Sequence, residues 1–159
     1  MDRKIFMTNC KKIFKENGFM VKGTTHFYKD LSNDIMLVIA MTHSSYDSVY
    51  YFDGGFVIKC LNQYMPYPKY YDVNVRCATI KVAGQYAFNY LEMTDSDFSV
   101  LNEAIQQKID FLCNCDDKKR ILDNIILPNA YAYCKDYNTQ DYFDGCIPEC
   151  KLHPEVNQQ

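Results

Sequence analysis

The stretch IMLVIAMTHSSYDSVYYFDGGFVIKC, residues 35–60, decides the fold. Residues 35–41 are apolar on both faces of a pleat, and their length and β-branched content favour a strand covered on both sides. Residues 50–60 form a second long strand, with Tyr50, Phe52, Phe56 and Ile58 on one face and Tyr51 and Asp53 on the other. The connection of residues 42–49 is short enough for an antiparallel hairpin.

Further short strands extend this hairpin on both sides. Residues 19–22 and 26–29 precede it, around a turn at residues 23–25, and residues 72–82 and 85–93 follow it, around a turn at Gly84. Gly54-Gly55 in the middle of the second long strand indicates either a bulge or a close approach by another backbone. We therefore expect a mainly antiparallel sheet.

Helices flank the sheet at both ends of the chain. Residues 3–17 place Phe6, Cys10, Ile13 and Phe14 on one helical face, and Asp2 is positioned to cap that helix. The run Thr94-Asp95-Ser96-Asp97 is typical of a helix start, so a helix is expected to about residue 113. Another is expected over residues 118–127, ending at a proline, and a last short one over residues 129–137.

This order predicts a single-domain α+β protein with an N-terminal helix, a mainly antiparallel sheet and C-terminal helices packed on one face. The domain is expected to span residues 1–137 of the 159, and residues 138–159 to form a loosely packed polar tail. The other face of the sheet is where an open patch or groove is expected.

Charge argues against a nucleic-acid partner. The net charge is −3, the isoelectric point is about 5.5, and no dense basic stripe is present. No apolar run approaches the ~18–20 residues that cross a bilayer, and residues 1–9 lack the apolar run of a signal peptide, so we expect a cytosolic protein without a membrane role. In a reducing compartment the eight cysteines are expected to be small buried hydrophobes rather than a disulfide framework.

A zinc site is a weak alternative for some of these cysteines. Cys113, Cys115, Cys146, Cys150 and His153 supply five donors, but their spacing does not form the two Cys-x-x-Cys knuckles of a zinc ribbon. We expect neither a metal nor a cofactor, with Cys113 buried and Cys115 exposed.

The polar hairpin end around His43 and Ser44 is the alternative that would make this protein an enzyme. Nucleophilic catalysis needs an orienting acid and an oxyanion donor, and no Gly-x-Ser-x-Gly elbow surrounds Ser44. Histidine and serine are also ordinary residues in turns, so the sequence favours a protein without catalytic activity, and a catalytic site at this hairpin end stays the alternative.

Tyrosines give the strongest hint of function. The chain has 14 tyrosines and no tryptophan, and the segment of residues 64–71 combines four of them with two prolines. Such a loop either covers the core or displays rigid aromatic rings to a partner. The candidate binding residues are Tyr64, Tyr67, Tyr70 and Tyr71, with Tyr46 and Tyr51 nearby in sequence. We expect a non-enzymatic binding module, and one specific form of this hypothesis is a protein that sequesters a protein partner, as small immunity-like proteins do. The oligomeric state does not follow from the sequence.

A set of core and turn residues forms a pattern over about residues 3–127: Gly18-Phe19, Lys22-Gly23, Phe27-Tyr28-Lys29, Ser44, Tyr51-Phe52, Gly55-Phe56 and Asp72-Val73-Asn74-Val75-Arg76. This pattern resembles the bacterial family called domain of unknown function 4304 (DUF4304). Met41-Thr42-His43 departs from the Gln-Lys expected ahead of that serine. The resemblance implies a small cytosolic bacterial α+β protein and assigns it no reaction.

Overall fold

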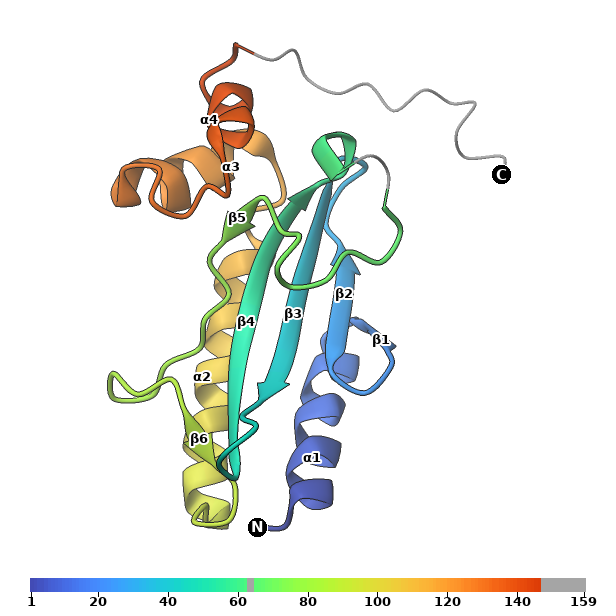
Figure 1. Cartoon of the computed structure of the whole chain (residues 1–159), viewed down its shortest axis with the longest axis vertical. Coiled ribbons are helices and arrows are strands. Elements are labelled where there is room, and N and C mark those ends of the chain that lie inside the picture. Colours follow the sequence, from blue (N-terminus) through green and yellow to red (C-terminus); the bar gives the residue numbers. More distant parts are fainter. Residues whose placement is uncertain (63–64, 147–159) are drawn as a thin grey trace.

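A computed structural model describes residues 1–62 and 65–146 of the chain. In this part, six strands form one antiparallel sheet (Figure 1). The strands are β1 (Met20–Lys22), β2 (His26–Asp30), β3 (Ile35–His43), β4 (Val49–Ile58), β5 (Val75–Arg76) and β6 (Phe88–Asn89). They follow the order β1-β2-β3-β4-β5, and β6 also pairs with β4. The predicted hairpin of β3 and β4 is confirmed, with Ile35 opposite Ile58 and His43 opposite Tyr50.

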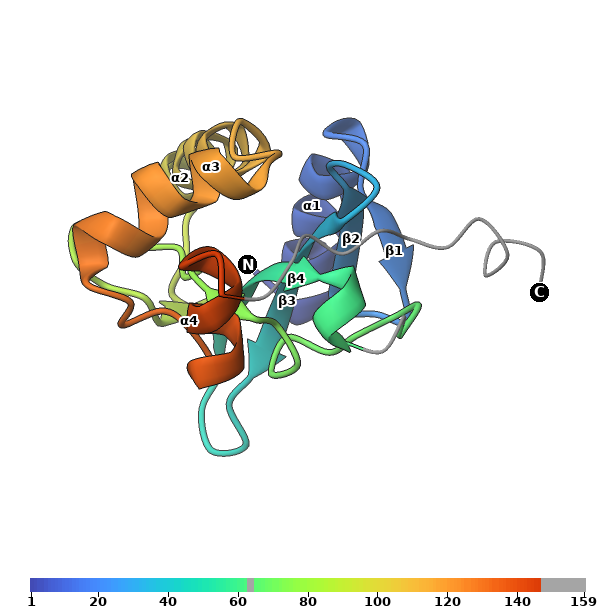
Figure 2. The same ribbon diagram turned by 90° about the horizontal axis from the view of Figure 1, so that it is seen from above.

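Two helices cover one face of the sheet, α1 (Arg3–Glu16) and α2 (Asp95–Cys113); Figure 2 shows them on the same side. The residues predicted for the inner face of α1, Phe6, Cys10, Ile13 and Phe14, are all buried. They share a core with alternate residues of β3 and β4 and with Leu101, Ile105, Ile109 and Leu112 of α2. The predicted α+β fold is therefore confirmed.

Side chains cap both helices as their sequences predict. Asp2 accepts a hydrogen bond from the backbone of Ile5 at 2.9 Å. Thr94 and Asp97 form a capping box, in which each side chain accepts from the other residue's backbone amide. The amides of Asn17 and Gln106 then join the end of α1 to the flank of α2 at 2.8–2.9 Å.

The second face of β3 is also buried, which explains why its sequence is apolar throughout. Met36 and Val38 lie in a smaller cluster with Tyr28 of β2, Val57 of β4 and Val73. Val73 comes just after the tyrosine- and proline-rich segment of residues 64–71, called the aromatic loop below. This loop, described from residue 65, returns across the face opposite the helices before entering β5.

Gly54 and Gly55 permit a close approach of backbones and not a bulge, since the pairing of β3 with β4 is continuous through both. A Cβ atom on Gly54 would lie 2.1 Å from the carbonyl oxygen of Val38, and one on Gly55 would lie 1.8 Å from that of Val75. Both glycines have positive φ, +129° and +155°. Only glycine allows β4 to sit this tightly between its two neighbours.

The strands predicted over residues 72–82 and 85–93 are much shorter than expected. β5 has two residues, because the amides of both Cys77 and Ala78 then donate to the single carbonyl of Gly54, at 3.0 and 3.1 Å, and the ladder ends there. Residues 77–81 leave the sheet and run along the gap between β4 and α2. β6 likewise pairs only through Phe88 and Asn89, although the predicted turn at Gly84 is present, with φ +80°.

The C-terminal region differs most from expectation. α3 (Lys118–Ile121) continues into a π-helical turn (Leu122–Ile126) and a 3-10 turn (Leu127–Asn129). The helix predicted over residues 118–127 is therefore present, but helical backbone continues through Pro128 to Asn129. The helix predicted over residues 129–137 is absent, because Ala130 and Tyr131 adopt positive φ. Residues expected to begin a loose tail instead form α4 (Tyr137–Phe143), which buries Thr139, Tyr142 and Phe143. Residues 147–159 of the expected tail lie outside the described residues.

One buried side chain holds α4 against the sheet. Asn74 accepts from the amide of Ile58 at 2.7 Å, and its own amide nitrogen lies 3.5 Å from the hydroxyl of Thr139. The backbone of Asn74 accepts from Lys135 at 2.8 Å. These hydrogen bonds act together with Tyr142 and Phe143, whose rings are buried in the main core, to hold α4 in place.

Candidate functional site

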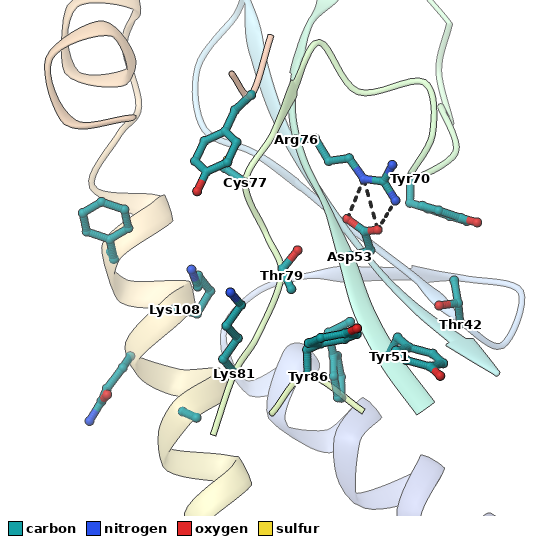
Figure 3. A pocket seen from close by; sticks show the side chains of 15 residues that line it. Thr42, Tyr51, Asp53, Tyr70, Arg76, Cys77, Thr79, Lys81, Tyr86 and Lys108 are labelled. Carbon is teal, nitrogen blue, oxygen red and sulfur yellow. Dashed lines mark hydrogen bonds and ion pairs between the residues drawn. The ribbon is translucent and has the colours of Figure 1, made fainter. Parts of the chain in front are cut away.

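A groove of about 860 Å³ lies beside the edge of β4 and is lined by β4, the segment of residues 76–86 and α2 (Figure 3). Its size falls within the range of ~300–1,000 Å³ that is usual for ligand sites. It is lined by Thr42, Tyr51, Phe52, Asp53, Tyr70, Arg76, Cys77, Thr79, Lys81, Tyr86, Ala104, Gln107, Lys108, Phe111 and Tyr133.

Three parts of the chain are brought together here by backbone hydrogen bonds. The two amides that converge on Gly54 direct residues 77–81 along the groove. The amide of Arg76 donates to the carbonyl of Tyr133 at 2.9 Å, and Val75 pairs with Cys134, so residues 133–134 extend the sheet beyond β5. The glycine pair of β4 therefore shapes the groove as well as the core.

A bidentate ion pair lies at one end of the groove. The Nε atom of Arg76 donates to both carboxylate oxygens of Asp53, at 3.0 and 3.1 Å, and Nη2 contacts the same carboxylate. This hydrogen bond, more than any other interaction, raises the pKa of Arg76. The guanidinium also lies 6.0 Å from the centre of the Tyr70 ring, so Asp53 both neutralises Arg76 and holds it beside an aromatic face.

Two lysines lie on the opposite side, where Figure 3 shows Lys81 and Lys108 next to α2. Within the described part of the chain, neither ammonium group has a carboxylate within ion-pair distance. Lys81 is exposed and Lys108 is half-buried. The groove is thus locally positive in a chain whose net charge is −3.

Aromatic rings supply most of the remaining surface. The rings of Tyr51 and Tyr86 are 6.1 Å apart, and Figure 3 shows both at the sheet side of the groove. Tyr86 is 56 % exposed and Phe111 is 47 % exposed, so these large rings face solvent where most large apolar groups are covered.

The Cys77 thiol is not prepared for nucleophilic chemistry. Burial raises its pKa to about 12, and its Sγ donates to the carbonyl of Val75 at 3.6 Å. A nucleophilic cysteine needs a lowered pKa, so this thiol stays protonated and contributes to packing.

Of the six tyrosines predicted to form a binding site, two line the groove, Tyr51 and Tyr70. Tyr71 is 62 % exposed, with its ring 5.3 Å from that of Tyr70, so it continues the aromatic surface beyond the groove. Tyr46 is 95 % exposed in the hairpin between β3 and β4 and does not line the groove. Tyr64 lies outside the described residues.

The aromatic loop lies over the second face of the sheet rather than across one end of it. Tyr67 packs against Tyr28 at 5.6 Å, and Tyr70 against His26 at 6.1 Å. Tyr67 remains 43 % exposed. Tyr70 both packs on the sheet and lines the groove, so this segment covers part of the sheet, and the display of its rings to a partner stays a prediction.

The binding residues predicted from the sequence did not include the charged residues of the groove or two of its tyrosines, Tyr86 and Tyr133. One signal was available, since alternation in residues 50–60 places Tyr51 and Asp53 together on the face away from the core. Lys108 gave no signal, because it enters the groove only through the way α2 packs beside β4.

The hairpin end around His43 and Ser44 has the geometry of a turn. The hydroxyl of Ser44 accepts from the amides of Tyr46 and Asp47, both at 3.2 Å. The exposed ring of His43 packs edge-on against Tyr50 at 4.9 Å. No hydrogen bond joins His43 to Ser44 in the described structure, and neither residue lines the groove.

Cys113, Cys115 and Cys146, the zinc candidates that the structure describes, are not part of a ligand cluster among the described residues. No group of three or more potential ligands was found in residues 1–62 and 65–146. Cys115 is buried and Cys113 half-buried, the reverse of the expected order, and Cys146 is exposed as a free thiol. Cys150 and His153 lie outside the described residues.

In residues 1–62 and 65–146, no helix has the length and hydropathy needed to cross a membrane.

Comparison with known proteins identifies a family for the chain. Residues 10–111 match the model of domain of unknown function DUF4304, and this range includes every groove residue except Tyr133. No curated protein and no solved structure gave a significant match. Because the match covers more than half of the sequence, the chain belongs to the DUF4304 family.

Proposed function

We propose that this protein is a non-enzymatic binding module that holds a segment of a protein partner in the groove beside β4. One observation carries the proposal: the groove aromatics continue onto the surface through Tyr70 and Tyr71, whose rings are 5.3 Å apart. Tyrosine is enriched at protein interfaces because its ring buries a large area while losing little conformational entropy.

The shape of the groove also favours a polypeptide. It is bounded by the β4 edge, the crossing segment of residues 77–81 and α2, and it is open to solvent. A partner segment lying in it would cover Tyr51 and Tyr86 and extend towards Tyr71. Sequestering a partner in this way is the immunity-like role that the sequence suggested.

Photocrosslinking in the organism's own cells tests this proposal. A benzophenone amino acid replaces Tyr86 in one variant, and in a control variant it replaces Lys12, whose exposed side chain lies on α1. We expect the Tyr86 variant to form a discrete adduct that mass spectrometry resolves into one partner, and the Lys12 variant not to form it.

The identified partner is then titrated into purified protein to establish direct binding. Adducts of the same proteins from both positions, or none from Tyr86 while the variant remains folded, would contradict a partner site in the groove.

A further inference from the structure

We infer that the segment bound in the groove is acidic, and that carboxylate or phosphate oxygens of the partner bind between Lys81 and Lys108; this inference rests on the binding role proposed above. Four charged side chains line the groove, and two of them, Asp53 and Arg76, neutralise each other in a bidentate pair. Lys81 and Lys108 remain, so the lining carries two positive charges without a carboxylate partner in the described structure.

Arg76 is less suited than the lysines to receive the anion, because its charge is already paired with a carboxylate. Its Nε and Nη2 atoms already bind Asp53, and its guanidinium is held near Tyr70. Each lysine ammonium, in contrast, has three donors. The two lysines also come from separate elements, the crossing segment and α2, so the tertiary fold is what places them in one groove.

The two sides of the groove differ in chemistry, as Figure 3 shows. Lys81 and Lys108 lie on the side of α2, whereas Tyr51 and Tyr86 lie on the side of the sheet, with Thr79 between them. A ligand that carries both an oxyanion and a planar apolar group matches both sides. In a partner segment this combination is an acidic or phosphorylated residue together with an aromatic or proline ring.

Scattered solvated lysines are the competing explanation, and small-molecule probes distinguish it. The ¹⁵N-labelled protein is titrated with phenyl phosphate, with phenylacetate and with neutral benzyl alcohol while amide shifts are recorded. We expect both anions to shift amides of residues 77–81 and 104–111 at concentrations where benzyl alcohol does not. Stronger binding of phenyl phosphate would identify a phosphate ligand, and equal or stronger binding of phenylacetate a carboxylate ligand.

A double variant, Lys81→Gln with Lys108→Gln, supplies the charge test. Loss of both ammonium groups should weaken binding of the preferred anion by about tenfold or more. The matched control, Lys12→Gln with Lys15→Gln, removes the same charge from α1 and should bind as the unmodified protein does. Equal weakening in both variants, or anion-induced shifts spread over surface lysines generally, would overturn the inference.

The partner found by crosslinking separates this inference from the proposed function. If the partner crosslinks at Tyr86 but binds the Lys81→Gln, Lys108→Gln variant with unchanged affinity, the acidic-segment inference is wrong and the binding role stands. If the anions bind in the groove but Tyr86 forms no adduct, the oxyanion site stands and the protein-partner role is wrong. The dispersion of the amide spectrum confirms in each case that the variant is folded.

Discussion

Replacing Gly54 with alanine introduces a methyl group where the sheet leaves no space. The added carbon would lie 2.1 Å from the carbonyl oxygen of Val38 and 3.2 Å from the Cα of Ile39. Real Cβ atoms essentially never come within 3.0 Å of such a neighbour, so β3 and β4 have to separate locally by about 1 Å. Both groups are backbone atoms of paired strands, so neither can rotate away.

The energetic cost has two parts. Forcing extra volume into a packed site costs about 1–3 kcal/mol. Holding an alanine at φ +129°, which L residues rarely adopt, adds about 1–3 kcal/mol. The total, about 2–6 kcal/mol, is a large fraction of the ~5–15 kcal/mol that stabilises an ordinary domain.

Urea unfolding of this variant beside a matched control gives the measurement. Gly84 also has positive φ, +80°, but nothing lies within 4 Å of its missing Cβ, so Gly84→Ala reports the strain alone. The crowding cost of about 1–3 kcal/mol, divided by a slope of about 1–3 kcal/mol per molar urea, should place the unfolding midpoint of the Gly54 variant about 0.3–3 M below that of the Gly84 variant. Equal midpoints would refute the close approach of β3 and β4 at this position.

Three further predictions concern groups away from the groove. Asn74→Ala leaves the buried amide of Ile58 without its acceptor, so unfolding by urea should show a loss of about 1–3 kcal/mol; an unchanged midpoint would contradict the anchoring role. Burial, and then the charge of Lys69, lowers the pKa of His26, so the unfolded chain binds more protons and stability falls as pH drops below about 6.5. His26→Gln should remove this loss between about pH 7.5 and 5.5, whereas an identical pH dependence in both proteins would exclude it. Thr94→Ala removes the capping box and should lower Tm by about 2–4 °C, and a Tm within error of the unmodified protein would show that the cap contributes nothing.

Local patterns predicted the elements whose own residues determine them. α1 and the β3–β4 hairpin follow from periodicity, and the start of α2 follows from side-chain oxygens that accept nearby amides. Each of these signals lies within a few residues of the element it predicts, so one sequence suffices to find it.

The missed features depend on contacts between distant residues. Apolar and polar side chains alternate in residues 77–81 as in a strand. The amides of Cys77 and Ala78 nevertheless both donate to the carbonyl of Gly54, which ends the pairing of β5 with β4. α4 packs Tyr142 and Phe143 into the core and contacts Asn74, more than sixty residues earlier in the chain. The groove could not be predicted for the same reason, because Tyr51 and Lys108 line one groove only after α2 has packed beside β4.

The affinity of the crosslinked partner for a groove variant tests the central claim most directly. Titration calorimetry compares the unmodified protein with Tyr51→Ala, Tyr86→Ala and with a control variant, Tyr46→Ala, whose exposed ring lies outside the groove. If the groove is the binding site, the double variant should lose about tenfold or more in affinity, roughly 1.4 kcal/mol or more, and the control should not change. An unchanged affinity in a folded Tyr51→Ala, Tyr86→Ala protein would contradict the claim that this groove holds the partner.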